Sequence, residues 1–332
     1  MKATKLSFFS ICLAILTAYS TIIISFIWIT TYTNHRDSTL YTNNNPLQWK
    51  SMYNHDTKAI KYPGQEELRW QNVAYENVLI KHDEVTLSGW LTIQDSSKPV
   101  VVIVHGIAPN SKAKDEAILL YNLLAKAKFN VLSIDLQNYG QSTITSNFIK
   151  LGQTEYLDVL AAVQWLIQKK DFHPSQIGVA GLSLGAVTSA IAFSKDPNIS
   201  ALWLDSPFTN FNTMVAHELS RYQLHYHTFI KQSIDLYSQW LFGFQPAKLS
   251  AIDAIKEANG RPILITHGKK DTRIPISHTL EFITTALKKK ANISYWLVGN
   301  EGHLEALLNQ PEHYQKNLVK FFSKHLADKP KS

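Results

Sequence analysis

Short apolar runs alternate with segments of helical periodicity over most of this 332-residue chain. Runs that are apolar throughout, rather than at every second position, are typical of strands buried on both faces of a sheet. Their alternation with helices predicts an α/β fold with a mostly parallel sheet and helices on both faces. The runs interpreted as strands are residues 101–105, 130–135, 177–183, 200–205, 262–268 and 293–298.

Two parts of the chain depart from this alternation. Residues 76–81 and 85–93 have apolar residues at alternate positions around a polar turn, which predicts an antiparallel pair of strands before the parallel ones. Residues 207–250, between two of the predicted strands, are rich in aromatic residues and helical in texture. We therefore expect a helical insertion that forms a lid, rather than a separate domain.

The N-terminal segment carries no charged residue from Leu6 to Asn34. A run of this length can cross about 30 Å of hydrocarbon as a helix. Lys2 and Lys5 precede it, so the positive-inside rule predicts a cytoplasmic N-terminus and a domain on the extracytoplasmic side. The alternative is a cleaved signal peptide with small residues near 18–20 as its cleavage site, which also leaves the domain outside the cytoplasm.

These patterns divide the chain into four parts. Residues 1–34 are expected to be a single-pass membrane anchor or an uncleaved signal, and residues 35–74 a polar tether. Residues 75–326 form the predicted α/β domain with its lid, and residues 327–332 form a short tail.

Composition argues against several kinds of partner. The formal net charge is +7, but the lysines are dispersed, and the densest run, residues 288–290, has only three. We therefore predict no nucleic-acid partner. The one cysteine, Cys12, lies in the apolar N-terminal segment, which excludes disulfides and thiolate chemistry from the predicted domain.

Three histidines of the insertion, His217, His225 and His227, could suggest a metal site. No carboxylates accompany them at metal-ligand spacing, so they are interpreted as a polar face of the insertion. No phosphate-binding glycine loop occurs either. The sequence therefore predicts neither a metal nor another cofactor.

The segment VAGLSLGAV, residues 179–187, places a serine between two glycines at the end of a predicted strand. In the G-x-S-x-G pattern the strand bends sharply into a helix and presents the serine hydroxyl. The backbone before and after the serine comes close together there, so Gly181 and Gly185 are required. Ser183 is the predicted nucleophile, and the N–H of Leu184, which begins the helix, is a predicted oxyanion donor.

A serine nucleophile needs a base and a group that orients the base. His303 follows the last predicted strand in a loop with glycines, and Asp271 follows the strand before it. We predict His303 as the base and Asp271 as its partner. Asp205, at the end of another strand, is the alternative acid. Glu301 is too close in sequence to His303 to orient it and is interpreted as a solvated turn residue.

The loop after residues 101–105 is expected to supply the second oxyanion donor. His105 and Gly106 mark the turn, and the N–H of Ile107 is the predicted donor, with Ala108 as the alternative. His105 is interpreted as a brace for this loop through hydrogen bonds, rather than as a base.

Through these residues the chain resembles the alpha/beta-hydrolase family over about residues 75–326. The order Ser183, Asp271, His303 is the order of the triad along the chain in that family. The resemblance implies an α/β-hydrolase fold and a serine hydrolase.

The similarity is greatest to the serine-aminopeptidase-like and monoacylglycerol-lipase-like branch. That branch carries HG after one strand and D-x-x-x-x-G-x-S after the next, and this chain has them at 105–106 and 135–142. Where the branch often has arginine, this chain has Gln137.

The predicted function is that of a membrane-tethered serine hydrolase that cleaves carboxylic esters of small or lipid-like acyl groups through an acyl-enzyme. Peptidase, thioesterase and acyltransferase activities use the same residues and are the alternatives, followed by a non-catalytic binding protein. The insertion is expected to line the acyl pocket over the carboxyl ends of the strands. Phe208, Phe211 and Trp240 are the predicted substrate-binding residues.

Overall fold

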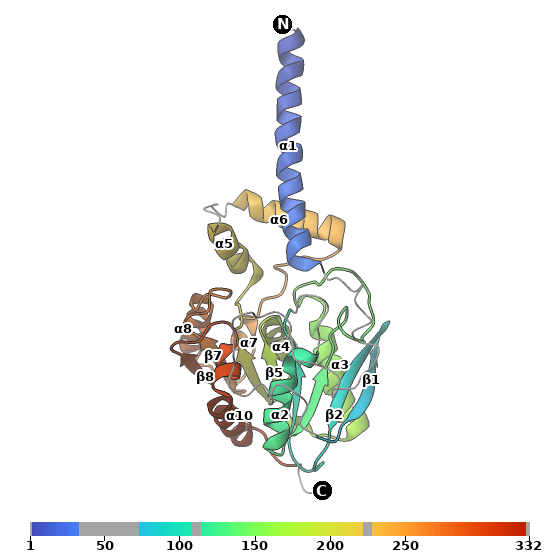
Figure 1. Ribbon diagram of the computed structural model, residues 1–332, viewed down its shortest axis with the longest axis vertical. Helices are drawn as coiled ribbons and strands as arrows, with labels where there is room; N and C mark the ends of the chain where they lie inside the picture. Colours follow the sequence, from blue (N-terminus) through green and yellow to red (C-terminus); the bar gives the residue numbers. More distant parts are fainter. Residues whose placement is uncertain (1, 33–72, 108–113, 222–227, 330–332) are drawn as a thin grey trace.

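The computed structural model describes residues 2–32, 73–107, 114–221 and 228–329. Within these ranges one sheet forms the centre of a domain, and one long helix projects from it (Figure 1). The polar tether expected at 35–74 lies almost entirely outside the described residues, as do the last three residues of the expected tail.

The sheet has eight strands. They are β1 (Glu76–His82), β2 (Val85–Thr92), β3 (Val100–Val104), β4 (Asn130–Ile134), β5 (Ile177–Leu182), β6 (Ala201–Asp205), β7 (Ile263–Gly268) and β8 (Ile293–Val298). Their order across the sheet is β1-β2-β4-β3-β5-β6-β7-β8. The hairpin β1-β2 is antiparallel and β2 is antiparallel to β4, whereas all other neighbours are parallel.

Helices cover both faces of the sheet. On one face lie α3 (Tyr156–Lys170), α4 (Leu184–Lys195), α7 (Asp253–Lys256) and α8 (Ser277–Lys289), and on the other lie α2 (Ile118–Lys126), α9 (Glu305–Asn309) and α10 (Pro311–His325). Because every residue of β3, β4, β5 and β6 is buried, these strands are mostly apolar rather than alternating between apolar and polar residues.

Successive side chains of a central strand enter two different cores. Val102 and Val104 of β3 belong to the core on the α3 and α4 face, whereas Val101 and Ile103 belong to the core on the α2 and α10 face. The two cores are separate because successive side chains of a strand point to opposite faces of the sheet.

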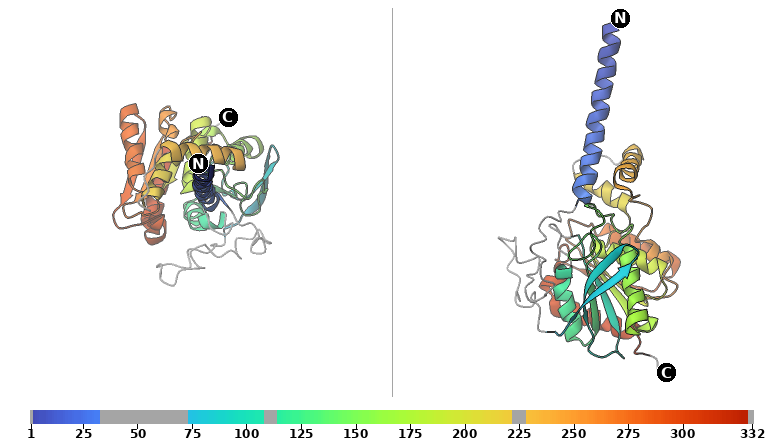
Figure 2. Two further views of the ribbon diagram at one scale, coloured as in Figure 1. Left: turned by 90° about the horizontal axis from the view of Figure 1, so that it is seen from above. Right: turned by 90° about the vertical axis from the view of Figure 1, so that its right-hand side faces the viewer.

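The insertion between β6 and β7 carries α5 (Phe211–Arg221) and α6 (Thr228–Phe242). Both lie beyond the carboxyl ends of the parallel strands, above the rest of the domain (Figure 1). The N-terminal helix α1 (Lys2–Thr31) crosses α6 close to the domain and then extends far beyond it (Figures 1 and 2).

The predicted α/β-hydrolase architecture is confirmed in the sheet, in its two helical layers and in the helical insertion. Each run interpreted as a strand lies at a strand, and residues 76–81 and 85–93 form the antiparallel hairpin. In the part of the chain that the structure describes, one helical stretch, Phe9–Thr31, is long and apolar enough to cross a membrane by length and composition.

Candidate active site

Ser183 stands at the junction where β5 ends and α4 begins. Its backbone angles are φ 53° and ψ −116°, in a region that residues other than glycine rarely adopt. The N–H of Ser183 donates a hydrogen bond of 2.8 Å to the carbonyl oxygen of Asp205 on the next strand. This bond holds the strained turn at the carboxyl edge of the sheet.

The glycines around Ser183 are required by close approach of the backbone. A Cβ at Gly181 would lie 2.4 Å from the carbonyl oxygen of Gly185. A Cβ at Gly185 would lie 2.2 Å from the carbonyl oxygens of Val104 and His105, at the end of β3. Neither neighbour is a flexible side chain, so the turn tolerates only glycine at both positions.

Ser183, His303 and Asp271 form a continuous chain of hydrogen bonds. The Nε2 atom of His303 lies 2.9 Å from Oγ of Ser183, and its Nδ1 atom lies 2.7 Å from Oδ2 of Asp271. Because a carboxylate only accepts, Nδ1 donates to Asp271, and Nε2 of the neutral imidazole accepts from the serine hydroxyl. This is the arrangement in which an imidazole removes a proton from a serine.

Asp271 is held as a charged carboxylate. Its Oδ1 atom accepts backbone N–H bonds from Arg273 at 2.9 Å and Ile274 at 2.8 Å. Burial raises the pKa of Asp271, but hydrogen bonds from His267 and His303 outweigh burial and hold the pKa well below its ordinary value. The residue can therefore orient His303 and stabilise its protonated form.

Asp205, the alternative acid, has other partners. Its Oδ2 atom accepts from the hydroxyl of Tyr314 at 2.8 Å, and its Oδ1 atom accepts from the hydroxyl of Ser206 at 3.0 Å. Burial raises the pKa of Asp205 to about 6. The geometry therefore brings Asp271, and not Asp205, to the imidazole.

A second histidine lies beside Asp271 and was not singled out from the sequence. The Nε2 atom of His267 donates to the carbonyl oxygen of Ile274 at 2.9 Å and lies 3.4 Å from Oδ2 of Asp271. His267 stands at the end of β7, which is where a residue that supports the Asp271 loop would be sought.

The residues predicted as oxyanion donors, Leu184 and Ile107, lie beside Ser183. Leu184 is the first residue of α4, where backbone N–H groups have no acceptor within the helix. Leu184, Ile107 and Ser183 line one cavity. Ala108, the alternative donor, lies outside the described residues.

His105 is a buried link between two loops. Its Nδ1 atom donates to the carbonyl oxygen of Gly106 at 2.8 Å, and its Nε2 atom accepts from the N–H of Leu136 at 3.2 Å. Burial lowers the pKa of His105, which favours the neutral form that this pattern requires. These contacts match the interpretation of His105 as a brace.

Gln137 supports the loop that follows β4 through hydrogen bonds of its side chain. Its Nε2 atom donates to Asp158 at 3.3 Å, and its Oε1 atom accepts from the hydroxyl of Thr145 at 3.2 Å. Asp158 also accepts from the N–H of Gln137 at 2.7 Å. An uncharged side chain therefore connects the loop to α3.

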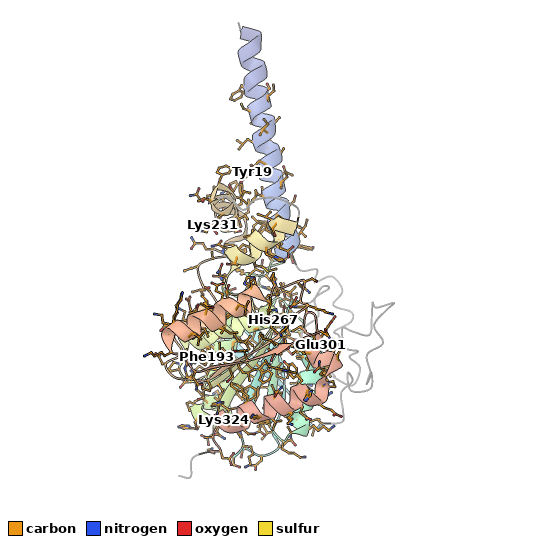
Figure 3. All side chains as sticks on the ribbon, turned by 90° about the vertical axis from the view of Figure 1, so that its left-hand side faces the viewer. Tyr19, Phe193, Lys231, His267, Glu301 and Lys324 are labelled. Atoms are coloured by element: carbon orange, nitrogen blue, oxygen red, sulfur yellow. The ribbon has the colours of Figure 1, made fainter. Side chains whose placement is uncertain are left out.

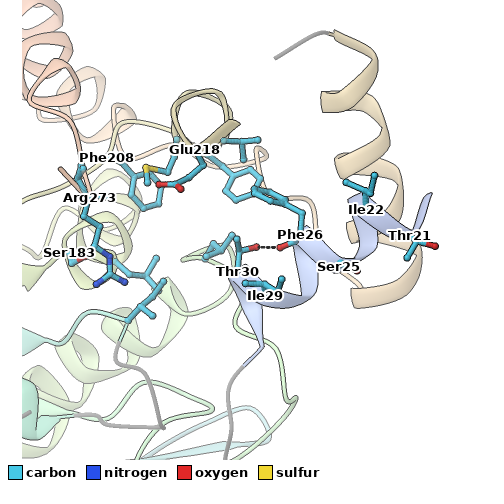
Figure 4. A pocket seen from close by; sticks show the side chains of 17 residues that line it. Thr21, Ile22, Ser25, Phe26, Ile29, Thr30, Ser183, Phe208, Glu218 and Arg273 are labelled. Atoms are coloured by element: carbon cyan, nitrogen blue, oxygen red, sulfur yellow. Dashed lines mark hydrogen bonds between the residues drawn. The ribbon is translucent and has the colours of Figure 1, made fainter. Parts of the chain in front are cut away.

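A largely apolar cavity of about 640 Å³ opens above Ser183 (Figure 4). Phe208 and Phe211, predicted from the sequence, line it together with Met214 of α5. The prediction for Trp240 is wrong: this side chain is 75% exposed and does not line the cavity. It lies on the side of α6 that faces away from the core. The number of aromatic residues in the insertion does not reveal which of them face the cavity.

The sequence also missed one wall of the cavity. It comes from α1, and its residues are Thr21, Ile22, Ser25, Phe26, Ile29 and Thr30. The N-terminal segment was interpreted only as an anchor, because an apolar run carries no sign of which domain surface it meets.

Glu301 is not the solvated turn residue that was expected. It is 7% exposed, and its carboxylate accepts from the side-chain amides of Asn309 at 2.6 Å and Gln310 at 2.8 Å. Glu301 thus connects the loop of His303 to the end of α9 and the start of α10. The closeness of Glu301 to His303 in the sequence did not reveal these partners.

His217 lies on α5, whereas His225 and His227 lie outside the described residues. Among the residues that the structure describes, no group of three or more His, Cys, Asp or Glu side chains could hold a metal ion. The chemistry of the Ser183 site, a hydroxyl, an imidazole and a carboxylate, is that of acyl transfer.

Comparison with known proteins identifies the family. The model of the prolyl oligopeptidase family matches residues 121–329, which is more than half of the chain. An uncharacterized protein of Bacillus subtilis is 24% identical over 71% of this chain and 74% of its own length. Dipeptidyl aminopeptidase BIII of Pseudoxanthomonas mexicana is 25% identical over 68% of this chain but only 34% of its own length.

Other relatives differ in activity and length. Lysophosphatidylserine lipase ABHD12 of Xenopus tropicalis is 25% identical over 55% of this chain and 45% of its own length. The chain thus spans less than half the length of two of these relatives. Among solved structures, an esterase of Pyrococcus furiosus aligns with a TM-score of 0.61 and 21% identity, over 82% of this chain and 97% of its own.

The structural likeness confirms the α/β-hydrolase fold that the motifs predicted. The narrower branch expected from the sequence, that of serine aminopeptidases and monoacylglycerol lipases, is not the family that the match names. This chain belongs to the prolyl oligopeptidase family and is a serine hydrolase of the esterase and peptidase class.

Proposed function

We propose that this protein is a membrane-tethered esterase that hydrolyses carboxylic esters with long acyl chains. The observation that carries the proposal is the chain of hydrogen bonds Ser183–His303–Asp271, whose serine lines a largely apolar cavity. Ser183 is the nucleophile, His303 the general base and Asp271 the residue that orients His303.

In the first half of the reaction, Oγ of Ser183 adds to the acyl carbon while Nε2 of His303 takes the hydroxyl proton. The N–H groups of Leu184 and Ile107 donate to the oxyanion of the tetrahedral intermediate. The bond to the leaving alcohol then breaks, and the imidazolium returns the proton to the alcohol oxygen. The product of this half is an acyl-enzyme on Ser183.

In the second half, water takes the place of the alcohol. It adds to the acyl carbon and gives a proton to Nε2 of His303. The tetrahedral intermediate collapses, Ser183 recovers the proton, and a carboxylic acid leaves. Atoms and charges balance with no cofactor.

The lining of the cavity supports an acyl chain as the group that is bound. Phe208, Phe211, Met214 and Val215 face the same space as Ser183. Each methylene that is transferred from water to such surroundings contributes about 0.8 kcal/mol. Two relatives bear names that fit ester cleavage, the lysophosphatidylserine lipase and the Pyrococcus esterase.

Peptide hydrolysis is the second candidate. The family name and two relatives, dipeptidyl aminopeptidase BIII and the acylamino-acid-releasing enzyme of mouse, favour it. One observation on this chain favours it too: two charged residues, Glu218 of α5 and Arg273, line the otherwise largely apolar cavity. Thioesters and acyl transfer to an alcohol use the same triad.

The tether belongs to the proposal as well. We infer that α1 crosses the membrane with its N-terminus in the cytoplasm, which leaves the hydrolase domain on the extracytoplasmic side. The support is the charge-free stretch with Lys2 and Lys5 before it. A reporter that is active only after export, fused to the C-terminus, should be active, and the full-length protein should fractionate with membranes. A soluble, shortened product would contradict the anchor.

A fluorophosphonate probe and a substrate panel test the function. The probe should label the wild type, and Ser183→Ala should not be labelled. The panel pairs p-nitrophenyl esters of two to sixteen carbons with aminoacyl anilides. We expect kcat/KM to favour the longer esters over every anilide. Equal labelling of Ser183→Ala would contradict the nucleophile, and faster cleavage of an anilide would establish the peptidase instead.

A further inference from the structure

We propose that α1 is a wall of the acyl-binding site as well as an anchor, so that the acyl chain reaches Ser183 along α1 from the lipid layer. The substrate would then be a lipid ester resident in the membrane, whose chain leaves the leaflet next to α6. This inference rests on the proposed esterase function and adds the class of substrate and the route by which it enters.

One side of α1 faces the cavity. The lining residues from Thr21 to Thr30 are pairs of neighbours, and each pair follows the one before it by four positions, which marks a single face. In Figure 4 this face lies opposite Phe208 and Ser183, across the open space of the cavity. An acyl chain bound over Ser183 would therefore touch α1 on one side and α5 on the other.

The threonine hydroxyls of this wall are satisfied within the helix. Thr21 donates to the carbonyl oxygen of Thr17 at 2.9 Å, and Thr30 donates to that of Phe26 at 2.8 Å. Their methyl groups and the side chains of Ile22 and Ile29 make the remaining surface of the wall. Such a wall suits a hydrocarbon chain better than a polar headgroup.

Side-chain contacts fix α1 to the insertion. The hydroxyl of Tyr19 donates to Oγ of Ser233 at 3.0 Å, and the hydroxyls of Ser20 and Tyr237 lie 2.7 Å apart. The ring of Tyr19 stacks on Phe229 with 5.2 Å between centroids. Figure 3 shows Tyr19 at the level where α1 passes the insertion.

Deeper contacts hold the end of the helix. Ile23 and Ile27 of α1 are 5% and 2% exposed and belong to the main core of the domain. Trp28 and Tyr32 both pack on Phe148, with centroid distances of 4.9 and 5.7 Å. The last third of α1 is therefore part of the domain and not a loose connection.

The wall continues away from the domain. Thr21 and Ile22 also line a shallow groove on α1 whose other residues are Ser10, Leu13, Ala14, Thr17 and Ala18. The cavity over Ser183 and this groove thus share two residues, and both follow the same helix. An acyl chain that lies along this face of α1 in the lipid layer would therefore reach the cavity at Thr21 and Ile22.

Exposed apolar side chains of α6 place the surface of the lipid layer at the insertion. Phe229, Leu236 and Trp240 are 61%, 64% and 75% exposed. Their spacing of seven and four positions puts them on one side of α6. Ser233 lies on that side as well and contacts Tyr19, so α1 leaves the domain on the side where these apolar groups are exposed.

The length of α1 leads to the same position. Lys5 precedes the charge-free stretch, and residues 6–18, between Lys5 and the contact of Tyr19 with α6, rise about 20 Å as a helix. A hydrocarbon layer is about 30 Å thick. Residues 6–18 alone do not span it, so the charge-free stretch crosses the layer only if the layer reaches α6, where Phe229, Leu236 and Trp240 enter the interface.

A variant pair tests the wall in the full-length protein in phosphatidylcholine vesicles. Ser25→Trp places a large side chain into the cavity from α1, whereas Leu16→Trp makes a similar change on an exposed part of α1 that lines neither the cavity nor the groove. The readout is the ratio of kcat/KM for p-nitrophenyl palmitate to that for p-nitrophenyl acetate. Ser25→Trp should lower this ratio about tenfold, as expected if two methylenes lose their place.

Leu16→Trp should stay within about twofold of the wild-type ratio, the scale of an ordinary surface change. An unchanged ratio in Ser25→Trp would overturn the wall, and so would an equal fall in both variants.

A second experiment needs no variant. An alkyl fluorophosphonate with a diazirine near the end of its chain labels Ser183 in vesicles and is then activated by light. Crosslinks should fall on residues 21–30 of α1. Crosslinks only on α5 and α6 would overturn the inference and leave the esterase intact, whereas absence of labelling at Ser183 would overturn the esterase and the inference with it.

Discussion

The floor and the roof of the cavity are built in different ways. The floor, which holds Ser183, Asp271 and His303, lies at the ends of buried strands, and backbone hydrogen bonds set its geometry. The roof consists of α1 and α5, and α6 packs against α1 through apolar and aromatic side chains and a few hydroxyl contacts. Trp240 and Leu236 of α6 remain exposed.

The difference separates chemistry from selectivity. Proton transfer from serine to imidazole requires atoms at fixed distances, and buried strand ends supply them. Binding of a hydrocarbon chain requires only matching apolar surface, which helices can supply in many arrangements. Relatives with peptidase and lipase names are consistent with this division.

The floor contains a second contrast, between two buried carboxylates. Asp271 accepts from two backbone N–H groups and two histidines lie beside it, so its pKa is lowered. Asp205 accepts from hydroxyl groups only, and burial raises its pKa to about 6. Hydrogen bonds from N–H groups thus lower the pKa of the carboxylate that contacts His303, whereas burial raises the pKa of the other.

The largest expected effect tests this assignment. Asp271→Asn should lower kcat by roughly 10⁴-fold, as the corresponding change does in a serine protease, because the imidazole loses the partner that fixes its tautomer. Asp205→Asn is the matched control, since this carboxylate does not contact His303. Steady-state kinetics on a p-nitrophenyl ester would measure both. If Asp205→Asn loses activity while Asp271→Asn keeps it, Asp205 and not Asp271 is the acid that orients His303.

A smaller effect concerns stability and pH. The pKa of Asp205 is about 6 in the folded protein, above its ordinary value of 3.8. Between these values the folded state binds more protons than the unfolded state, so the free energy of unfolding falls as pH rises through this interval. The interval corresponds to about 3 kcal/mol for this one group.

Thermal denaturation of the purified protein at pH 4, 5, 6 and 7 would measure this contribution. Tm of the wild type should fall more steeply over the range than Tm of Asp205→Asn, which cannot titrate. Parallel curves for the two proteins would show that burial of Asp205 carries no such cost.

The smallest expected effect lies in the roof. Phe211→Ala removes a ring from the wall of the cavity, so the ratio of kcat/KM for long over short acyl esters should change by roughly tenfold. Trp240→Ala should leave the ratio for soluble esters unchanged, because this side chain lies outside the cavity. A shift in Trp240→Ala equal to that in Phe211→Ala would show that the bound state closes the roof further.

Much of the floor was predictable because it depends on local patterns and chain order. Apolar runs mark buried strands, and a glycine-flanked serine at the end of one marks a sharp turn. His303 and Asp271 follow from their places after the last two strands. The choice between Asp271 and Asp205 needed the structure, because both residues lie at strand ends and only the path of their loops brings one to the imidazole.

Glu301 was misjudged for a related reason. Its position two residues before His303 suggested an exposed turn, but its carboxylate receives two amide groups from eight and nine residues further along the chain. The sequence of the turn alone does not show hydrogen-bond partners that lie at the end of one helix and the start of the next.

The sequence by itself determined the α/β class, the sharp turn at Ser183 and the apolar length of α1, because periodicity and composition record which residues avoid water. Only the tertiary structure decided that α1 closes one side of the cavity and that Trp240 points away from it. A helix that is apolar on every side carries no pattern that marks one face for the domain and another for lipid. Which surface each face meets is a property of the packed chain, and here the packing places one face of α1 in the same cavity as Ser183.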